Sequence, residues 1–184
     1  MHDRTLKLVK RAHTVDDFKK ALALATAIGF KTINADLIVG LEGENSQDVI
    51  ESVQALIELD INSITIHSLA IKRAAGLNKS MSTVENIERE FIAQTLRDAR
   101  VILKSADFEP YYMYRQKNIA GNQENIGYSK PGHECLYNSY MIADCQSIFS
   151  VGAGGITKIK RGEAHKNIIG IKDPYNYINN INGI

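Results

Sequence analysis

Asp36 is the residue in the first half of the chain whose position most suggests chemistry. It falls within 32–39, a stretch that predicts a β-strand, and side chains alternate between the two faces of a strand. Asp36 therefore shares a face with Asn34, whereas the other face is apolar. A strand that helices cover on both faces is apolar throughout. We expect Asp36 to face a partly wet space and to accept hydrogen bonds, because a buried carboxylate without a partner is costly.

The next predicted strand, 61–69, has a polar face of the same kind. Ser63, Thr65 and His67 alternate with isoleucines there. Two successive strands of this kind indicate a barrel whose interior is partly wet and functional. Two interpretations of Asp36 stay open at this point. It binds a ligand hydroxyl or amine, or it pairs with a His or Lys of a neighbouring strand and only shapes the core.

The segment 111–138 mixes aromatic, basic and amide side chains without a clear period. Such a segment either lines a site for a flat, anionic ligand or forms an irregular loop whose polar groups satisfy one another. Long loops of compact domains are usually functional, which favours the ligand site. The adjacent His133, Glu134 and Cys135 do not predict a metal site, because neighbours in sequence rarely point at one ion. No base for Cys135 is identifiable by spacing, so no catalytic residue is assigned.

Alternating helices and strands must position these residues, as in α/β proteins. Thr14 and Asp17 form a near capping box before the first helix, and Ser46 is expected to cap the second. In chain order the predicted elements are helix 15–28, strand 32–39, helix 46–60, strand 61–69, a helix from Ser82 or Thr83 to about residue 105, and strand 110–115. This spacing implies parallel strands joined by right-handed crossovers.

The pattern changes after residue 115. Strand-like stretches follow at 146–151 and 156–160, and a short helix is expected to begin at Pro174. The GAGG stretch at 152–155 is similar to a phosphate-binding glycine turn, but it lacks the third glycine and the helix that should follow. We therefore expect a tight turn or close backbone packing there.

Composition bounds the partners and the compartment. The chain has 184 residues, a formal net charge of +1 and 44% hydrophobic residues, which is ordinary for one globular domain. Near-neutral charge gives no general attraction to nucleic acid or membrane surfaces. No apolar run reaches the roughly 18 residues of a membrane helix, and no signal peptide is evident. Cys135 and Cys145 are the only cysteines, so we expect a reducing, cytoplasmic setting.

Four motifs in order resemble those of the oxygen-independent coproporphyrinogen III oxidases, a radical SAM family. The stretch INADLIVGLEGEN at 33–45 resembles the family's DLI-GLPGE motif, and NIGYSKPGHECLYN at 125–138 resembles its SNFAKPGHE–HN segment. SVGAGGITKI at 150–159 resembles the GLGAGA-S segment, and RTLKLVKRAHTVDDF at 4–18 resembles the ETL–IGR–H segment. Together these motifs cover most of the chain.

The resemblance implies an α/β fold, the C-terminal half of a radical SAM (β/α)6 barrel with parallel strands over 1–115. It implies a family-specific, irregular and β-containing extension packed on the barrel over 116–184. In the family, S-adenosylmethionine and a [4Fe–4S] cluster serve to convert propionate side chains of a porphyrinogen to vinyl groups. The implied cofactor contacts are Asp36 and the backbone near Leu69 and Ala70.

Candidate substrate contacts come from the aromatic and basic segment. They are Tyr112, Arg115 and His133, and Arg115 is the strongest because a guanidinium suits a propionate carboxylate. Glu42 stands where the family usually has proline, and Gly155 where it has alanine. The near-neutral charge gives no support to a third possibility, a radical SAM enzyme that acts on RNA bases.

The largest departure from the family is the missing CxxxCxxC motif, which holds the cluster. The family's glycine-rich SAM motif is missing as well. We therefore expect the parent protein to be the enzyme and this chain alone to be inactive. The alternative is a haem-binding or haem-transfer relative of the same family. A remnant of a barrel exposes a sheet edge, so we also expect self-association through that edge.

Overall fold

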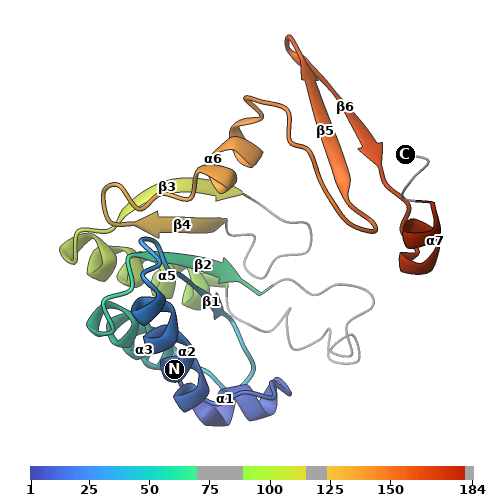
Figure 1. The fold of residues 1–184 in the computed structure, drawn as a ribbon. Coiled ribbons are helices and arrows are strands. Elements are labelled where there is room, and N and C mark those ends of the chain that lie inside the picture. Colours follow the sequence, from blue (N-terminus) through green and yellow to red (C-terminus); the bar gives the residue numbers. More distant parts are fainter. Residues whose placement is uncertain (70–88, 115–123, 181–184) are drawn as a thin grey trace. The chain divides into compact units, whose positions relative to one another are not determined.

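A computed structural model describes residues 1–69, 89–114 and 124–180, with the side chains of residues 89 and 90 left aside. The chain divides into two compact units, Met1–Cys135 and Leu136–Ile184. Figure 1 shows the elements of both units in chain order.

The first unit is built on a four-stranded sheet in the order β1-β2-β4-β3 (Figure 1). β1 (Asn34–Val39) and β2 (Ser63–Ser68) are parallel. β4 (Asn125–Ser129) is antiparallel both to β2 and to β3 (Glu109–Tyr114). β1, β2 and β3 therefore run in one direction and end at the same edge of the sheet, which we call the carboxyl edge. β4 begins at this edge.

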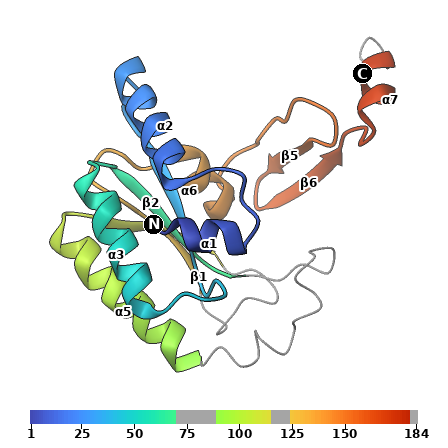
Figure 2. The same ribbon diagram turned by 90° about the horizontal axis from the view of Figure 1, so that it is seen from below.

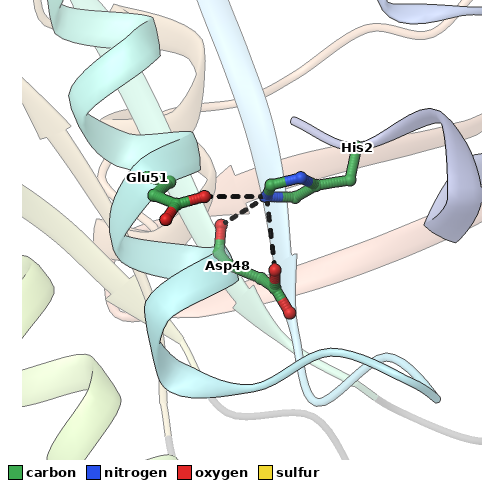
Figure 3. A group of neighbouring side chains, drawn as sticks. All are labelled: His2, Asp48 and Glu51. Carbon is green, nitrogen blue, oxygen red and sulfur yellow. Dashed lines mark hydrogen bonds and ion pairs between the residues drawn. The ribbon is translucent and has the colours of Figure 1, made fainter.

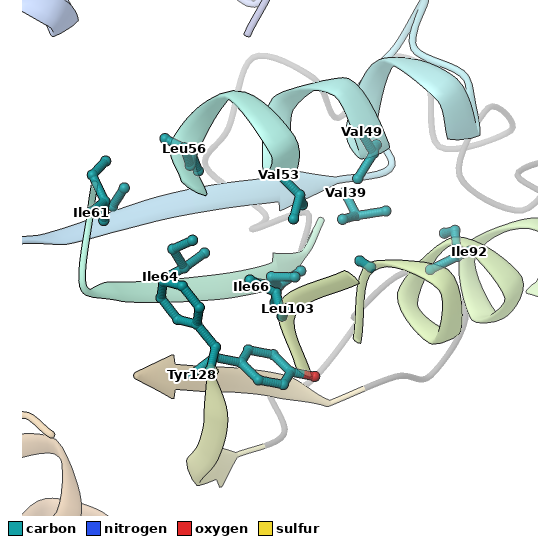
Figure 4. Close-up of a cluster of buried hydrophobic side chains, with 13 residues drawn as sticks. Val39, Val49, Val53, Leu56, Ile61, Ile64, Ile66, Ile92, Leu103 and Tyr128 are labelled. Atoms are coloured by element: carbon teal, nitrogen blue, oxygen red, sulfur yellow. The ribbon is translucent and has the colours of Figure 1, made fainter. Parts of the chain in front are cut away.

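Two helices, α3 (Ser46–Glu58) and α5 (Arg89–Ser105), bury their apolar sides against one face of this sheet (Figure 2). α2 (Val15–Ile28) has no buried residue, although Phe18 and Leu22 pack against the core, and the short α1 (Asp3–Leu8) leads into α2. The inward residues of α3, β2 and α5 form the centre of the core (Figure 4). Its most buried members are Val39, Val49, Val53, Ile61, Ile64, Ile66, Ile92, Ala99, Leu103 and Phe108, all at most 2% exposed.

Local sequence explains the ends of α2. The Thr14 hydroxyl oxygen accepts a hydrogen bond from the Asp17 backbone N–H at 3.1 Å, and the Asp17 carboxylate accepts one from the Thr14 backbone N–H at 2.8 Å. This is the capping box that the sequence predicts. Gly29 ends the helix with φ +90°, a conformation that glycine adopts without strain.

The start of α3 differs by one residue from the prediction. The cap is Asn45, whose side-chain oxygen accepts a hydrogen bond from the Asp48 backbone N–H at 3.1 Å. Ser46 is already helical, and its hydroxyl lies 2.7 Å from the Thr95 hydroxyl of α5. The predicted cap was wrong because Asn45 has both the extended backbone and the amide oxygen that a cap requires.

The pairing of β3 is the main difference between the predicted and observed sheets. The parallel β1–β2 pair is confirmed, but β3 does not pair with β2, because β4 lies between them. The sequence pattern predicts a loop over 125–129. β4 nevertheless turns Ile126 and Tyr128 towards the core, and Tyr128 is only 4% exposed. A fourth strand therefore buries apolar side chains that a loop would leave in water.

The second unit consists of α6 (Leu136–Ala143), the antiparallel hairpin β5 (Ile156–Arg161) and β6 (Ala164–Ile169), and α7 (Pro174–Asn179). The strand near 156–160 and the helix beginning at Pro174 are confirmed. The stretch 146–151 is not a strand, although Ile148 makes one isolated bridge to Lys158.

The GAGG turn packs as closely as its glycines suggest. The Gly170 backbone N–H donates to the Gly155 carbonyl at 2.8 Å. A Cβ on Gly155 would lie 2.7 Å from the Ser150 hydroxyl oxygen. The predicted role in close backbone packing is therefore confirmed.

Among the described residues, no helix is both long enough and apolar enough to cross a membrane.

Candidate functional site

A chain of polar side chains crosses the sheet on the face opposite α3 and α5. In β1, the Asn34 side-chain oxygen accepts hydrogen bonds from the hydroxyls of Ser63 and Thr65 in β2, at 3.0 and 3.1 Å. The amide nitrogen of Asn34 donates to Asp36 Oδ1 at 2.7 Å. We call this surface of Asn34, Asp36, Thr65, His67, Tyr112 and Tyr114 the polar face. Asn34 thereby links Asp36 to the neighbouring strand.

Asp36 lies on the polar face as predicted, but it is not buried. Its side chain is 63% exposed, and the nearest ring nitrogen is His67 Nε2, 3.6 Å from Asp36 Oδ1. Interaction with His67 is the largest cause that lowers the pKa of Asp36, and the Asn34 amide lowers this pKa further. The histidine pairing that the second interpretation foresaw is present. The exposure of the carboxylate nevertheless leaves it accessible to a ligand, which a core residue would not be.

Two tyrosines of β3 extend the polar face. The Tyr112 hydroxyl lies 3.3 Å from the Thr65 hydroxyl, and burial raises the pKa of Tyr112. The Tyr114 hydroxyl lies 3.4 Å from His67 Nδ1. The two tyrosine rings are nearly parallel, with centroids 6.2 Å apart.

A glycine in β4 makes room for this arrangement. Tyr112 is paired with Gly127 in the sheet, and its ring lies where a side chain at 127 would stand. A Cβ built on Gly127 would come within 1.9 Å of Tyr112 Cε1. Tyr112 can reach across β4 to Thr65 of β2 only because residue 127 has no side chain.

The carboxyl edge of the sheet brings the other predicted cofactor contact close to the polar face. The Leu69 backbone N–H donates to the Val39 carbonyl at 2.9 Å, immediately after β2. The side chain of Asn125, which is 1% exposed, accepts a hydrogen bond from the Ser68 backbone N–H at 2.9 Å. Ala70 and Arg115, two further predicted contacts, lie outside the described residues.

His133 lies at the other end of the sheet from Leu69. Its Nδ1 is 3.2 Å from the Thr32 hydroxyl, just before β1, and the neighbouring Lys130 N–H donates to the Asn62 carbonyl at 3.0 Å. β4 is antiparallel and therefore carries the segment after it away from the carboxyl edge. The structure thus brings Tyr112 to Thr65, the neighbour of Asp36 in the sheet, but it does not bring His133 there.

Four residues of the polar face were not among the predicted site residues: Asn34, Thr65, His67 and Tyr114. The alternation along the two predicted strands placed the first three on the face of Asp36, so the signal was present. Tyr114 and the role of Gly127 had no such signal, because they depend on β4 as the neighbour of β3. Alternation in Asn125-Ile126-Gly127-Tyr128-Ser129 before Pro131 and Gly132 would have indicated that strand.

His2, Asp48 and Glu51 form a group with metal-ligand chemistry among the described residues (Figure 3). His2 Nε2 lies 3.6 Å from Asp48 Oδ1 and 3.7 Å from Glu51 Oε2. The Asp48 carboxylate already has partners on both oxygens, because Arg4 pairs with Oδ1 and the Asn45 backbone N–H donates to Oδ2 at 2.9 Å. A cation here would compete with the Arg4 guanidinium. We therefore interpret the group as the connection between α1 and the start of α3.

Replacing Asp48 with asparagine should destabilise the chain in a pH-dependent way. The Asn45 backbone N–H, followed by Arg4, holds the pKa of Asp48 below its usual value of about 3.9. A lowered folded-state pKa stabilises the fold above the unfolded-state pKa, and this contribution disappears as the pH falls through the folded-state value. Urea unfolding should therefore show a deficit in Asp48→Asn at pH 7 that shrinks towards pH 3.

Asp16→Asn is the matched control for this experiment. Asp16 is an exposed helix residue that pairs with Lys20 one turn away, at 2.7 Å. Such pairs contribute little to stability. A deficit of Asp48→Asn that stayed constant between pH 7 and pH 3 would contradict the electrostatic interpretation.

The residues present fit the two cofactors of the family unequally. An exposed carboxylate beside a strand end, as Asp36 is, can accept hydrogen bonds from the hydroxyl or amine groups of S-adenosylmethionine. The cysteines do not fit a [4Fe–4S] cluster, which requires several thiolates. Cys135 and Cys145 are the only cysteines of the sequence, and they fall in different units.

Comparison with known proteins gives a consistent set of relatives. The chain is 36% identical over 177 residues to the oxygen-independent coproporphyrinogen-III oxidase-like protein HemZ of Bacillus subtilis, which covers 95% of the chain and 35% of that protein. It is 27% identical over 139 residues to the heme chaperone HemW of Mycobacterium tuberculosis, 73% of the chain and 32% of that protein. No family model matches the chain.

A solved structure has the same fold. It is coproporphyrinogen III oxidase (HemN) from Escherichia coli, described as a radical SAM enzyme, and it matches with a TM-score of 0.64 and 14% identity. The match covers 100% of the chain and 41% of that protein. The chain spans about a third of the length of the curated relatives named above. These findings confirm the resemblance that the sequence motifs indicate.

Proposed function

Since the chain is a relative of the oxygen-independent coproporphyrinogen-III oxidase-like proteins along 95% of its length, we propose that it forms the part of such an enzyme that helps to hold S-adenosylmethionine and a porphyrinogen. The observation that carries the proposal is Asp36. This carboxylate is exposed on a polar face and lies in the stretch that resembles the family's DLI motif. When bound, S-adenosylmethionine would supply the radical that removes a hydrogen atom from a propionate side chain, and loss of carbon dioxide and of one electron to an acceptor would then leave a vinyl group.

The fold supports a place for the first unit in a (β/α) barrel. β1, α3 and β2 form one parallel strand–helix–strand unit, with the helix on the face away from the polar side chains. In our proposal residues 1–115 continue such a barrel and residues 116–184 form an extension specific to the family. Barrel enzymes place their sites at the carboxyl ends of the strands, and Leu69 and Asn125 lie at that edge.

The candidate site residues of this chain fall into two groups, proposed cofactor contacts and proposed substrate contacts. Asp36 and the backbone after Leu69, including Ala70, would hold S-adenosylmethionine. Tyr112 is the described substrate candidate with the strongest support, because its ring lies on the face of Asp36. Arg115 follows the strand of Tyr112 directly and remains a proposal from sequence. His133 has weaker support, because it lies near Thr32 at the opposite edge.

The cluster has no ligands among the residues of this chain. We propose that the isolated chain is therefore inactive and that the whole gene product supplies the thiolates. Self-association through an exposed sheet edge and a cytoplasmic location remain predictions of the sequence, as does the absence of nucleic-acid and membrane partners.

The decisive experiment uses the gene product that contains this sequence, reconstituted anaerobically with iron and sulfide. With S-adenosylmethionine and coproporphyrinogen III, we expect the product with vinyl groups, detected by its fluorescence after oxidation. Asp36→Asn should weaken binding of S-adenosylmethionine by about 10- to 100-fold, the cost of losing a charge-assisted hydrogen bond. The chain alone should give no 5′-deoxyadenosine.

Asp16→Asn is again the control, since it removes an exposed carboxylate that lies in α2 and not on the polar face. Formation of 5′-deoxyadenosine by the isolated chain would refute its proposed inactivity. Equal affinity of wild type and Asp36→Asn for S-adenosylmethionine would remove the observation on which the proposal rests.

A second candidate function is haem binding or haem transfer. The similarity to the heme chaperone HemW over 73% of the chain favours it. The same gene product distinguishes the two functions, because stable haem binding without conversion of the porphyrinogen would support the second candidate and contradict the first.

A further inference from the structure

His67 is the imidazole nearest to the Asp36 carboxylate. The Asn34 amide and His67 Nε2 both approach the same oxygen, Asp36 Oδ1, at 2.7 and 3.6 Å. The side chain of His67 is 24% exposed, whereas that of Asp36 is 63% exposed. The histidine therefore contacts the carboxylate from the sheet side and leaves the carboxylate open to solvent.

The His67 ring is itself held from the other side. Tyr114 contacts it edge-on, with centroids 6.3 Å apart and planes at 71°, and the Tyr114 hydroxyl is 3.4 Å from Nδ1. Tyr114 stacks on Tyr112, which lies over Gly127 and reaches Thr65. The Tyr114 hydroxyl and the Asp36 carboxylate therefore lie at the two different nitrogens of the same ring.

We propose that His67 is a positioning residue for Asp36. It holds Oδ1 and leaves Oδ2 to accept a hydrogen bond from a ligand hydroxyl or amine. The identity of the ligand rests on the proposed function. The arrangement of Asp36, His67 and Tyr114 does not depend on it. A carboxylate fixed at one oxygen loses less freedom when a ligand binds at the other, which increases affinity.

Among the residues that the structure describes, few other titratable groups surround the pair. β1 contributes Asp36 itself, and β3 contributes Tyr112 and Tyr114. At the positions of β4 that face them, Asn125 and Gly127 carry no charge. A change in the titration of Asp36 after a change at His67 can therefore be assigned to the direct interaction between these two residues.

The first measurement is the pKa of Asp36 in the full chain, determined from the pH dependence of the carbon-13 NMR shift of its carboxyl group. In His67→Phe this pKa should rise towards its ordinary value of about 3.9. His67→Gln retains an N–H donor that can reach Oδ1 and should restore part of the decrease. Tyr114→Phe removes only the hydroxyl that faces Nδ1 and should have a smaller effect than His67→Phe.

His133→Phe is the matched control, because it replaces another histidine of the first unit, one that contacts Thr32 at the opposite edge. It should leave the Asp36 titration unchanged. An unchanged Asp36 pKa in a folded His67→Phe chain would overturn the inference, whatever the function. Thermal unfolding of each variant establishes that it is folded.

The second measurement is the affinity of the reconstituted gene product for S-adenosylhomocysteine, a stable probe, by calorimetry. His67→Phe should weaken this affinity by about 10-fold, the lower end of what outer partners of ligand-binding groups contribute. Unchanged affinity in His67→Phe, with binding still weakened in Asp36→Asn, would refute the positioning role and leave the proposed function intact. A shifted Asp36 pKa without binding by wild type would support the contact and refute the proposed function.

Discussion

Gly127→Ala should lower the free energy of unfolding by about 1–3 kcal/mol, the usual cost of forcing extra atoms into a packed site. The conflict is with one ring, because the added Cβ would lie 1.9 Å from Tyr112 Cε1. The backbone of Gly127 is not in the left-handed region, so alanine is otherwise acceptable there. Urea unfolding measures this effect, and loss of the Tyr112 contact with Thr65 should accompany it.

A double variant separates this steric effect from any other role of Gly127. In Tyr112→Ala the ring is absent, so adding Gly127→Ala to it should cost little or nothing. Two residues in direct contact are expected to show such non-additivity. If Gly127→Ala were equally damaging with and without the Tyr112 ring, the steric explanation would be wrong.

Phe108→Ala should have the largest effect on stability, a loss of about 3–5 kcal/mol. Phe108 follows α5 and is 1% exposed, and its backbone N–H donates to the Leu103 carbonyl at 3.0 Å. Removing the ring leaves a cavity in the core and also removes one partner of Lys130, whose Nζ lies 5.7 Å from the ring centroid and which also pairs with Asp60. Chemical denaturation of the full chain is the appropriate measurement.

Phe30→Ala is the matched control, since Phe30 also follows a helix but is 60% exposed. Exposed substitutions usually change the free energy of unfolding by no more than about 0.5 kcal/mol. Similar losses in both phenylalanine variants would contradict the core position of Phe108.

Sequence reasoning succeeded where the deciding interactions are local. The capping box of Thr14 and Asp17 joins residues three apart, and the two faces of β1 and β2 follow from alternation within each strand. Asp36 could therefore be placed on a polar face without any tertiary information. The exposure of Asp36 could not be predicted in this way, because it depends on which elements cover the polar face.

Prediction from sequence failed where residues distant in sequence decide the structure. β4 has a glycine at its centre, and glycine is poor in strands, yet Tyr112 of β3 supplies the ring that covers it. Once β4 lies between β2 and β3, the chain must leave the sheet at the edge of Thr32. His133 follows it there, away from Tyr112, the other described residue predicted to contact the substrate.

The order of strands in the sheet also has a consequence for how the chain folds. β3 and β4 are close in sequence, with Tyr114 opposite Asn125, whereas β2 and β4 join residues as distant as Ser63 and Ser129. Pairing between distant residues is slow, because a long loop must close before any contact forms. We expect the β3–β4 hairpin to form early and to dock on β2 late. The contacts of Tyr112 with Thr65 and of Tyr114 with His67 cross that last junction, so the environment of Asp36 would be completed only in the final step of folding.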